Sequence, residues 1–576
     1  MIKRLTQCIR EYKKDTILSP LFVLLEVVME VAIPFVMAYL IDRGIEAGNI
    51  NMIIRYGLIL IGCALISLLF GALAGISCAR ASSGFAKNLR HDLFYQLQVF
   101  SFSNIDKFST ASLITRLTTD VSNVQNAFMM IIRIAIRCPA MLIFAMIMSF
   151  RINSRIAMIF LCALPVLGVG LYFIIRAVYP IFNRVFRTYD QLNGVVQENL
   201  GGIRVVKSYV REEHEIGKFD AISQKIYRDF SKAERILSLN SPLMQICVYS
   251  CMLLVSWLGA KLIVSGGMTT GELMSYFSYI MQILMSLMML SMVFVMITMS
   301  RASAERINEV LSEKSDIVNG DNPVTAVPSG SIEYRGVGFS YSKRPDKLVL
   351  SHIDLSIASG QTVGIIGGTG SSKSSLVQLI PRLYDVTDGQ VLVGGIDVRD
   401  YDLKTLRSDV AMVLQKNTLF SGSIKDNLRW GNPDASDEEL ERVCRLAQAD
   451  EFIRSFPEGY DTHIDQGGTN VSGGQKQRLC IARALLRRPK ILILDDSTSA
   501  VDTRTDALIR HAFREEIPDT TKIIIAQRVS SVMDADQIIV LDNGAISAVG
   551  THESLLQSSE IYREVYSSQQ KGVMAE

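Results

Sequence analysis

The chain has 576 residues, of which 49% are hydrophobic and 20% charged, and its formal net charge is +2 at pH 7. This length exceeds what one hydrophobic core supports, so at least two domains are expected. The apolar bias favours a membrane protein, and the small net charge argues against nucleic acid as a partner. Nine cysteines without a CxxC pair are expected to be reduced and to act as small hydrophobic residues, not as zinc ligands.

Six apolar runs in the first part of the chain are each about 20 residues long, the length that crosses a bilayer as a helix. They lie at residues 18–41, 57–76, 129–150, 156–175, 241–260 and 273–300. The segments 77–128 and 176–240 between them are long and rich in Lys and Arg, whereas the other loops are short. Because positively charged loops remain cytoplasmic, we expect a multi-pass protein of the cell membrane, embedded in the lipid bilayer, with both termini in the cytoplasm.

The second part of the chain has a different pattern. Residues 311–330 are polar and rich in turn-forming residues, which is typical of a linker. Beyond them, short β-branched runs at 363–366, 491–494 and 523–525 alternate with helical patterns, which predicts an α/β domain with a largely parallel sheet. The expected organisation is an α-helical transmembrane domain with six helices and long cytoplasmic extensions over residues 1–310, a linker over 311–330, and an α/β domain over 331–576.

A loop rich in glycine and serine follows the apolar run 363–366. It reads Gly367-Gly368-Thr369-Gly370-Ser371-Ser372-Lys373-Ser374 and is followed by Ser375. Backbone N–H groups and a helix N-terminus in such a P-loop face phosphates, Lys373 reaches the terminal phosphates, and Ser374 supplies a hydroxyl to Mg²⁺. Ser372 stands where this motif has glycine before the lysine. The loop therefore predicts that the α/β domain is a P-loop nucleotide-binding domain.

Two further motifs accompany the loop. Asp495 ends the apolar run 491–494, in the position of a second Mg²⁺ anchor. The segment Ser472-Gly473-Gly474-Gln475, after Val471, is expected to precede a helix that begins near Lys476, and it forms another nest of N–H groups for an anion.

In this order and at these spacings, the motifs resemble those of the ABC transporter superfamily, specifically its exporter half-transporters. The resemblance implies ATP and Mg²⁺ as cofactors and ATP hydrolysis coupled to transmembrane transport. It implies that Tyr341 stacks on adenine and that Ser374, Gln415 and Asp495 serve Mg²⁺. The residues that it places around ATP are Tyr341, Gly367, Thr369, Gly370, Ser371, Ser372, Lys373, Ser374, Ser375, Gln415, Ser472, Gly473, Gly474 and Gln475.

The resemblance also assigns roles to longer segments. Residues 499–502 resemble the loop that crosses to the opposite subunit, and Gln415 matches the glutamine that senses the transmembrane domain. Residues 111–120 and 198–209, one in each long inner loop, are similar to coupling segments. The alternative for each is an ordinary solvated helix.

Two residues depart from the family pattern at the catalytic positions. Asp496 stands where the family has a glutamate that polarises the attacking water, and Gln527 stands where it has the switch histidine. The aspartate carboxylate is ~1.5 Å shorter in reach, and a misplacement of about 1 Å can cost ~10²-fold in rate. The pair indicates a degenerate site that binds ATP and hydrolyses it poorly. The alternative is a tolerated pair of conservative substitutions.

A weak catalytic site beside an intact signature resembles the degenerate-site subunit of heterodimeric bacterial multidrug exporters. The implied partner is a different half-transporter with an intact catalytic glutamate and switch histidine. The expected substrate is a small amphipathic compound, with drugs first and lipids or peptides next. The alternative function is an ATP-gated channel or a regulatory membrane protein on the same fold.

The predicted spans carry two unusual sets of side chains. Met281, Met285, Met288, Met292, Met296 and Met299 share one helical face, which is expected either to contact substrate or to pack against helices and lipid. Charged residues at Glu26, Glu30, Arg133 and Arg137 lie one turn apart in the first and third spans. They form a polar patch for cationic substrates, a structural Glu–Arg pairing, which we favour, or arginines in the inner headgroup region.

Overall fold

The computed structural model describes residues 1–497 and 499–574. It divides into two compact units, which we call the helical unit (Met1–Gln98 and Thr110–Glu313) and the sheet unit (Val99–Ser109 and Lys314–Glu576). A short stretch before the third span therefore belongs to the second unit, although it lies within the first third of the chain.

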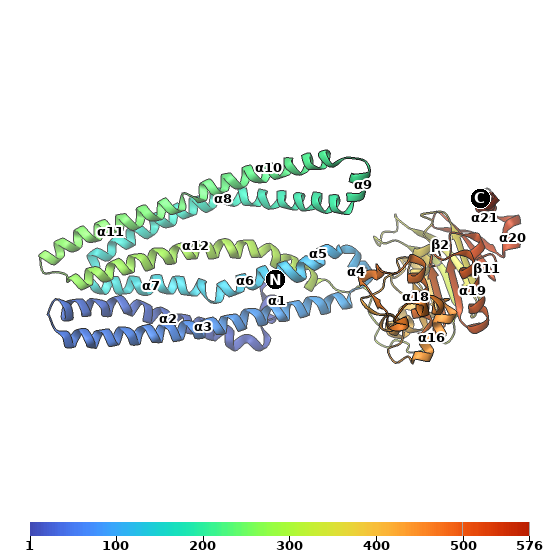
Figure 1. The fold of residues 1–576 in the computed structure, drawn as a ribbon, viewed down its shortest axis with the longest axis horizontal. Coiled ribbons are helices and arrows are strands. Elements are labelled where there is room, and N and C mark those ends of the chain that lie inside the picture. The colour runs from blue at the N-terminus through green and yellow to red at the C-terminus, as the bar shows by residue number, and fades with distance from the viewer. Residues whose placement is uncertain (498, 575–576) are drawn as a thin grey trace. The chain divides into compact units, whose positions relative to one another are not determined.

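The helical unit is built from long helices (Figure 1). Its elements are α1 (Ile2–Gln7), η1 (Arg10–Tyr12), α2 (Lys13–Leu40), η2 (Ile41–Ile45), α3 (Ile50–Val99), α5 (Thr110–Thr115), η3 (Arg116–Asp120), α6 (Val121–Ile132), α7 (Ile134–Ile152), α8 (Ser154–Gly201), α9 (Ile203–Ser208), α10 (Glu212–Leu237), α11 (Asn240–Val264) and α12 (Thr270–Ser312). Within the described residues, six helical stretches are long and apolar enough to span a membrane. Each contains one of the six expected apolar runs, which confirms that prediction.

The centre of the helical unit is formed where α2, α7 and α12 pack against one another. Pro34 lies inside α2 and lacks an N–H group, so the carbonyl group of Glu30, four residues earlier, loses its helical donor. Two side chains of α12 donate to neighbouring carbonyl groups of α2: Ser275 Oγ to the Pro34 carbonyl at 2.6 Å and Tyr279 Oη to the Val31 carbonyl at 2.9 Å. These two hydrogen bonds join α12 to α2 beside the proline.

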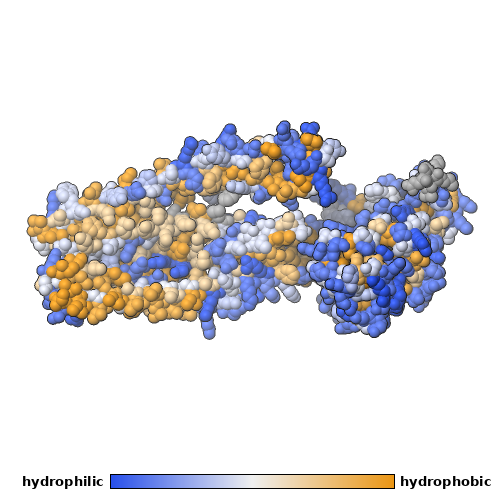
Figure 2. Space-filling view, viewed as in Figure 1, coloured by the Kyte–Doolittle hydropathy of each residue, from blue (hydrophilic) through white to orange (hydrophobic). Residues whose placement is uncertain are grey.

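The ends of the spans differ in character. Helices α8 and α10 pack side by side and are joined through the short helix α9 (Figure 1). Figure 2 shows the helical unit as mostly apolar where the six spans lie together and more hydrophilic along α8 and α10. Long, polar helical extensions therefore follow the apolar spans, as the sequence predicts.

The sheet unit contains two main sheets. Its strands are β1 (Ile332–Phe339), β2 (Leu350–Ile357), β3 (Thr362–Gly367), β4 (Asp388–Val393), β5 (Ile396–Asp397), β6 (Val410–Val413), β7 (Gly422–Ser423), β8 (His463–Ile464), β9 (Ile491–Asp495), β10 (Thr521–Ile525), β11 (Gln537–Asp542) and β12 (Ala545–Gly550). One sheet is antiparallel, in the order β2-β1-β4-β5, and the other runs β12-β11-β3-β10-β9-β6. All neighbours in the second sheet are parallel except β11 and β12.

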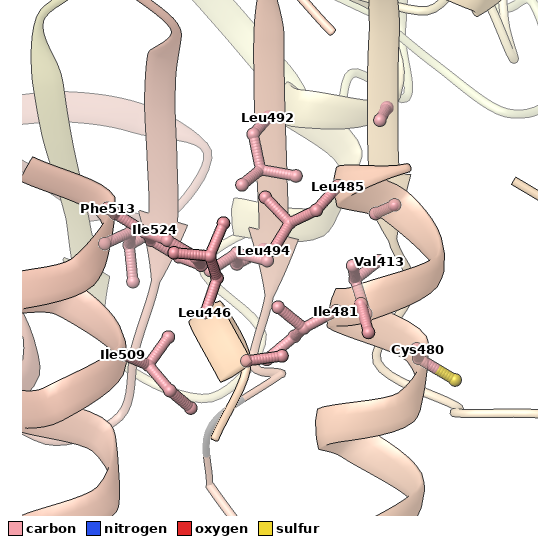
Figure 3. Packing of buried hydrophobic residues seen from close by; sticks show 14 of the residues in the cluster. Val413, Leu446, Cys480, Ile481, Leu485, Leu492, Leu494, Ile509, Phe513 and Ile524 are labelled. Carbon is pink, nitrogen blue, oxygen red and sulfur yellow. The ribbon is translucent and has the colours of Figure 1, made fainter. Parts of the chain in front are cut away.

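Short helices accompany these sheets. They are α4 (Phe102–Lys107), α13 (Lys373–Gln378), α14 (Leu403–Asp409), α15 (Ile424–Arg429), α16 (Asp437–Leu446), α17 (Asp450–Ser455), α18 (Gly473–Leu485), α19 (Thr503–Glu516), α20 (His552–Ser558) and α21 (Glu560–Met574), with 3₁₀ turns at Val398–Asp400, Gly459–Asp461, Gln466–Gly468 and Val529–Ser531. Buried side chains of α18 and α19 pack on the central strands β9 and β10, as Figure 3 shows for Ile481, Leu494 and Ile524. This core fixes the strands whose ends carry the candidate site.

Three strands place the predicted motifs at one edge. The runs 363–366, 491–494 and 523–525 form β3, β9 and β10, as expected, and they are parallel neighbours in the order β3-β10-β9. Because carboxyl ends of parallel strands meet at the same edge of a sheet, the loops after them converge. The loop after β3 is the glycine-rich one, Asp495 ends β9, and Gln527 follows β10.

Candidate functional site

The loop after β3 holds Lys373 against its own backbone. The Lys373 ammonium donates hydrogen bonds to the carbonyl oxygens of Gly367 and Gly368, both at 2.9 Å, and contacts Ser371 Oγ at 3.4 Å. Burial lowers the pKa of Lys373, while the nearby carboxylates of Asp495 and Asp496 oppose that shift. A half-buried cation at the start of α13 is suited to attract a phosphate.

The backbone of this loop is tightly constrained. A Cβ atom added at Gly367 would lie 2.3 Å from the Leu541 carbonyl oxygen, so only glycine fits there. Gly370 adopts φ +86° with open space around it, and Ser372 adopts φ +70°, ψ +26°. Ser372 therefore lies in the left-handed region at the position where the motif has glycine, which is strained for a residue with a side chain.

A hydroxyl and a carboxylate meet between α13 and β9. Ser374 Oγ donates to Asp495 Oδ1 at 2.8 Å, and Asp495 is buried. Burial raises the pKa of Asp495, although the hydrogen bond from Ser374 opposes the rise. Two hard oxygen ligands from different elements are what Mg²⁺ requires of a protein when phosphates complete its shell. The pair fits the predicted metal role of both residues.

Gln415, the third predicted metal ligand, is placed at the same edge by β6 but is exposed. It follows β6, which pairs with β9 through Val413 and Leu494. Among the described residues, its side chain forms no hydrogen bond with Ser374 or Asp495. The structure thus brings two of the three predicted metal ligands together and leaves the third nearby in the chain but not in contact with them.

The two residues at the catalytic positions contact each other. Gln527 Nε2 donates to Asp496 Oδ2 at 2.8 Å, and the Asp496 N–H donates to the Ile525 carbonyl oxygen at 3.1 Å. Asp496 is buried and adopts φ +50°. A neutral amide therefore holds the carboxylate, and no described histidine hydrogen-bonds to it.

A residue that the sequence did not reveal positions Gln527. Gln569, on α21, donates from Nε2 to the Gln527 carbonyl oxygen at 2.8 Å and accepts from the Val529 N–H at 2.9 Å. It comes from the far end of the chain, and nothing in its local sequence distinguishes it from other polar helix residues. The helix α21 thereby restrains the loop that follows β10.

Tyr341 offers a partly exposed ring beside the P-loop helix. Its hydroxyl hydrogen-bonds Ser375 Oγ at 2.8 Å, and 47% of the residue is exposed. Phe339 and Tyr384 contact it edge-on, with ring centroids at 4.8 and 5.1 Å. These contacts hold the ring in place, so its geometry is suited to the predicted stacking on adenine. Tyr384 is a second residue that sequence reasoning missed.

The segment Ser472-Gly473-Gly474-Gln475 forms the first turn of α18, which corrects the expectation of a helix that starts near Lys476. Helix α18 begins at Gly473 because Ser472 caps it: Ser472 Oγ accepts from the Gln475 N–H at 3.3 Å, and Gln475 Oε1 accepts from the Ser472 N–H at 2.9 Å. This capping box defines the helix N-terminus. Gln477, not predicted, joins the turn to the next loop by accepting from the Ala500 N–H at 3.1 Å.

Two family models match the chain. One described as "ABC transporter transmembrane region" covers residues 16–309, and one described as "ABC transporter" covers residues 350–499. The chain belongs to the ABC transporter family. Its second unit is accordingly an ATP-binding domain, its helical unit is a multi-pass membrane domain, and ATP hydrolysis is coupled to transport across the membrane.

Several relatives align over nearly all of this transporter. It is 36% identical over 549 residues to "Uncharacterized ABC transporter ATP-binding protein YfiB" of Bacillus subtilis (strain 168), which covers 95% of each chain. It is 30% identical over 582 residues to "Putative multidrug export ATP-binding/permease protein YgaD" of the same organism, which covers 99% of each chain. A solved structure described as "Structure of a bacterial Atm1-family ABC exporter with ATP bound" has the same fold, with a TM-score of 0.84 at 24% identity over 97% of this chain and 99% of that one.

The sheet unit of the transporter includes one short helix, α4, from the first long loop. Residues 111–120 form α5 and the π-helix η3 inside the helical unit, where Arg306 of α12 donates from Nε to Asp120 Oδ2 at 2.8 Å. Within the sheet unit, Tyr384 Oη donates to Asp106 Oδ2 of α4 at 2.6 Å. The coupling role of residues 111–120 stays a prediction. The second predicted segment, 198–209, contains the end of α8 and all of α9.

The membrane domain of the transporter confirms the favoured pairing of charges. Arg137 Nη2 donates to Glu30 Oε2 at 2.7 Å between α7 and α2. Of the methionine stripe on α12, Met281, Met285 and Met292 are exposed, and Met288 packs against the central core. The side chain of Met299 lies outside the described residues.

Proposed function

We propose that this chain is the degenerate-site half of a heterodimeric ATP-driven exporter, and that it moves amphipathic compounds out of the cell. Drugs are the leading substrate class, followed by lipids or peptides. The partner is a different ABC half-transporter with an intact catalytic glutamate and switch histidine. The protein resides in the cell membrane with both termini in the cytoplasm, on the evidence of the basic inner loops.

The hydrogen bond between Asp496 and Gln527 carries this proposal. In the family, a glutamate polarises the attacking water and a histidine contacts the γ-phosphate. Here the shorter carboxylate of Asp496 already accepts a hydrogen bond from an amide that cannot take up a proton at neutral pH. The pair is therefore poorly suited to orient water and well suited to hold a stable, slowly hydrolysing nucleotide.

The rest of the site supports nucleotide binding. Lys373, Ser374, Asp495 and the ring of Tyr341 have the residue types and contacts that ATP and Mg²⁺ need. Mg²⁺, when bound, would neutralise charge on the phosphate oxygens. Residues 367–375 bind and orient the phosphates, and Tyr341 orients the base, so the chain retains binding while its catalytic pair is weakened.

The capped signature supports a partner. Ser472 and Gln475 form reciprocal hydrogen bonds at the start of α18. The N-terminus of this helix is thereby fixed in a position where it can bind an anion. In the family this turn closes over the ATP bound by the opposite half. An intact signature beside a weak catalytic pair therefore fits a division of labour in which the partner hydrolyses ATP and this chain completes the productive site.

ATP hydrolysis by the purified two-chain complex tests the division of labour. Ser472→Ala removes a cap and a group aimed at the partner's nucleotide, and we expect turnover to fall ~10²–10³-fold. Asp496→Asn alters only the degenerate site, and we expect a modest change. Ser436→Ala, which removes a similar capping box at α16, is the control for helix destabilisation alone. The reverse pattern, with Asp496→Asn inactive and Ser472→Ala active, would exclude the proposal.

A further inference from the structure

Three charged side chains meet inside the membrane-spanning part of the helical unit. Glu26 and Glu30 lie one turn apart on α2, and Arg137 on α7 faces both. Figure 2 shows hydrophilic residues gathered between α2 and α7 within an otherwise apolar section. We call these three residues the carboxylate cluster. Charges at this depth are costly and mark functional positions unless they satisfy one another.

Glu30 and Arg137 are hydrogen-bonded to each other, but Glu26 lacks a hydrogen-bond donor for one of its oxygens. Glu30 Oε2 accepts a hydrogen bond from Arg137 Nη2 at 2.7 Å, whereas Glu26 Oε1 lies 3.6 Å from Arg137 Nη1, beyond hydrogen-bonding distance. Glu26 Oε2 is buried and has no hydrogen-bond partner among the described residues. Only 9% of Glu26 is exposed. The cluster thus contains a carboxylate oxygen without a donor.

The neighbouring helix leaves room for this carboxylate. A Cβ atom added at Gly71 of α3 would lie 3.2 Å from Glu26 Oε1, so a larger residue there would crowd the carboxylate. One turn along α3, the guanidinium of Arg133 lies 3.8 Å from the Cβ position of Gly75. Arg133 forms no ion pair with either glutamate among the described residues. The nearest cation to Glu26 is therefore Arg137, whose hydrogen bond goes to Glu30.

A carboxylate in a low-dielectric environment requires a donor, and the chemistry of the missing donor follows from the geometry. One guanidinium faces two carboxylates, so a cationic donor would balance the charge of the cluster, and its N–H group would supply the hydrogen bond that Glu26 Oε2 lacks.

We propose that Glu26 binds the protonated amine of an amphipathic substrate, with the Glu30–Arg137 pair holding α2 and α7 in place. This inference rests on the proposed export function and assigns its substrate class. A protonated amine compensates the negative charge of Glu26 and donates a hydrogen bond to its free oxygen. A quaternary ammonium compensates the charge but donates no hydrogen bond, and a neutral amide donates only a weaker hydrogen bond and carries no charge. Affinity should therefore fall in the order amine, quaternary ammonium, amide.

Three dansyl compounds with the same tail test this order: dansylcadaverine, its N,N,N-trimethyl derivative and its N-acetyl derivative. The full-length chain, with any second half that co-purifies, is placed in nanodiscs of phosphatidylcholine and phosphatidylglycerol. Neither lipid carries a cationic N–H group that could bind Glu26 in place of the amine. Dansyl fluorescence is titrated without nucleotide. We expect the amine to bind about tenfold more tightly than the acetyl derivative, which is the worth of one charge-assisted hydrogen bond.

Variants assign the preference to Glu26. Glu26→Gln should abolish the amine preference and leave the Glu30–Arg137 pair, and with it the melting temperature, intact. Glu46→Gln, at an exposed carboxylate outside the spans, is the matched control and should keep the preference. Gly71→Ala should weaken amine binding by crowding Glu26 without changing any charge, so it reports on the site even if Glu26→Gln fails to fold.

The outcomes separate this inference from the proposed function. Equal binding of amine and acetyl compounds by the wild-type chain would mean that a proton or a lipid satisfies Glu26, and it would overturn the inference. So would an amine preference that survives in Glu26→Gln. Neither result would affect ATP hydrolysis by the two-chain complex, measured on the same preparations, which tests the export function. Loss of hydrolysis with retained amine preference would count against export alone.

Discussion

At the residue scale, two of the three departures from the family pattern, Ser372 and Asp496, coincide with unusual backbone conformations. Ser372 and Asp496 both have positive φ, at +70° and +50°. Aspartate tolerates the left-handed region better than most residues, because its short side chain bonds locally, but serine has no such advantage. Ser372 therefore strains the glycine-rich loop. At Asp496 the backbone conformation is tolerated, and what changes is the reach of the carboxylate, which is shorter than that of a glutamate.

The variant Ser372→Gly tests this strain. Relief of the left-handed conformation is worth about 1–2 kcal/mol, and the greater freedom of glycine in the unfolded chain offsets about 0.5–1 kcal/mol of it. We expect a gain of up to ~1 kcal/mol in the stability of the ATP-binding domain, measured by thermal unfolding of the full chain. Ser372→Ala retains the strain and serves as the control. Equal stability of the glycine and alanine variants would show that the loop is not strained.

At the element scale, α2 and α7 are joined by an ion pair that a bilayer makes stronger. Glu30 and Arg137 are each about one-third exposed in the chain, and they are hydrogen-bonded at 2.7 Å. Removing one partner leaves the other charge uncompensated in an apolar environment, while removing both leaves two neutral polar groups. The pair therefore couples two helices that are distant in sequence.

A double-mutant cycle measures this coupling. Glu30→Gln and Arg137→Gln should each lower the melting temperature of the chain in lipid nanodiscs, and the double variant should lose less than the two together. We expect a coupling energy of about 1 kcal/mol or more. Arg151→Gln, near the end of α7 and without an ion pair among the described residues, is the control. Strictly additive losses would mean that the two side chains stabilise the helices independently.

At the scale of the whole molecule, the ATP-binding domain gathers Lys373, Ser374 and Asp495 at one edge of its sheet, caps the signature turn, and pairs Asp496 with Gln527. The Asp495–Ser374 contact and the Lys373 tether are formed within one chain. The signature turn contacts its own chain through Gln477 and Ala500. Under the proposed function, such a half binds nucleotide alone and requires a second half for rapid turnover.

We therefore expect the chain expressed alone to hydrolyse ATP slowly, and the two-chain complex to drive ATP-dependent accumulation of an amphipathic compound in inside-out vesicles. Installing the family residues, Asp496→Glu with Gln527→His, should raise hydrolysis by the lone chain, because the longer carboxylate and a titratable base return to the site. Lys373→Ala in the same background is the control. A vigorous ATPase from the wild-type chain alone would contradict the heterodimer, and nucleotide-gated flux without uphill transport would indicate a channel.

The local order of residues was enough to predict six spans, the parallel strands β3, β9 and β10, and the P-loop with Asp495 and Asp496. Each of these signals is contained in one short stretch, because apolar length, strand pattern and loop chemistry act locally. The pairing of Glu30 with Arg137 was also predicted, since buried charges in a membrane have few ways to be satisfied.

Only the tertiary structure decided the contacts that join distant stretches. It showed that Gln569 hydrogen-bonds to the loop after β10 and that Gln477 hydrogen-bonds to the loop after β9. It also showed that Tyr384 contacts both the ring of Tyr341 and helix α4. It moved the start of α18 to Gly473, because the reciprocal Ser472–Gln475 bonds stabilise an earlier turn. It also left one carboxylate oxygen of Glu26, Oε2, without a hydrogen-bond donor among the described residues. A sequence states which groups are present, but which of them meet depends on packing between elements far apart in the chain.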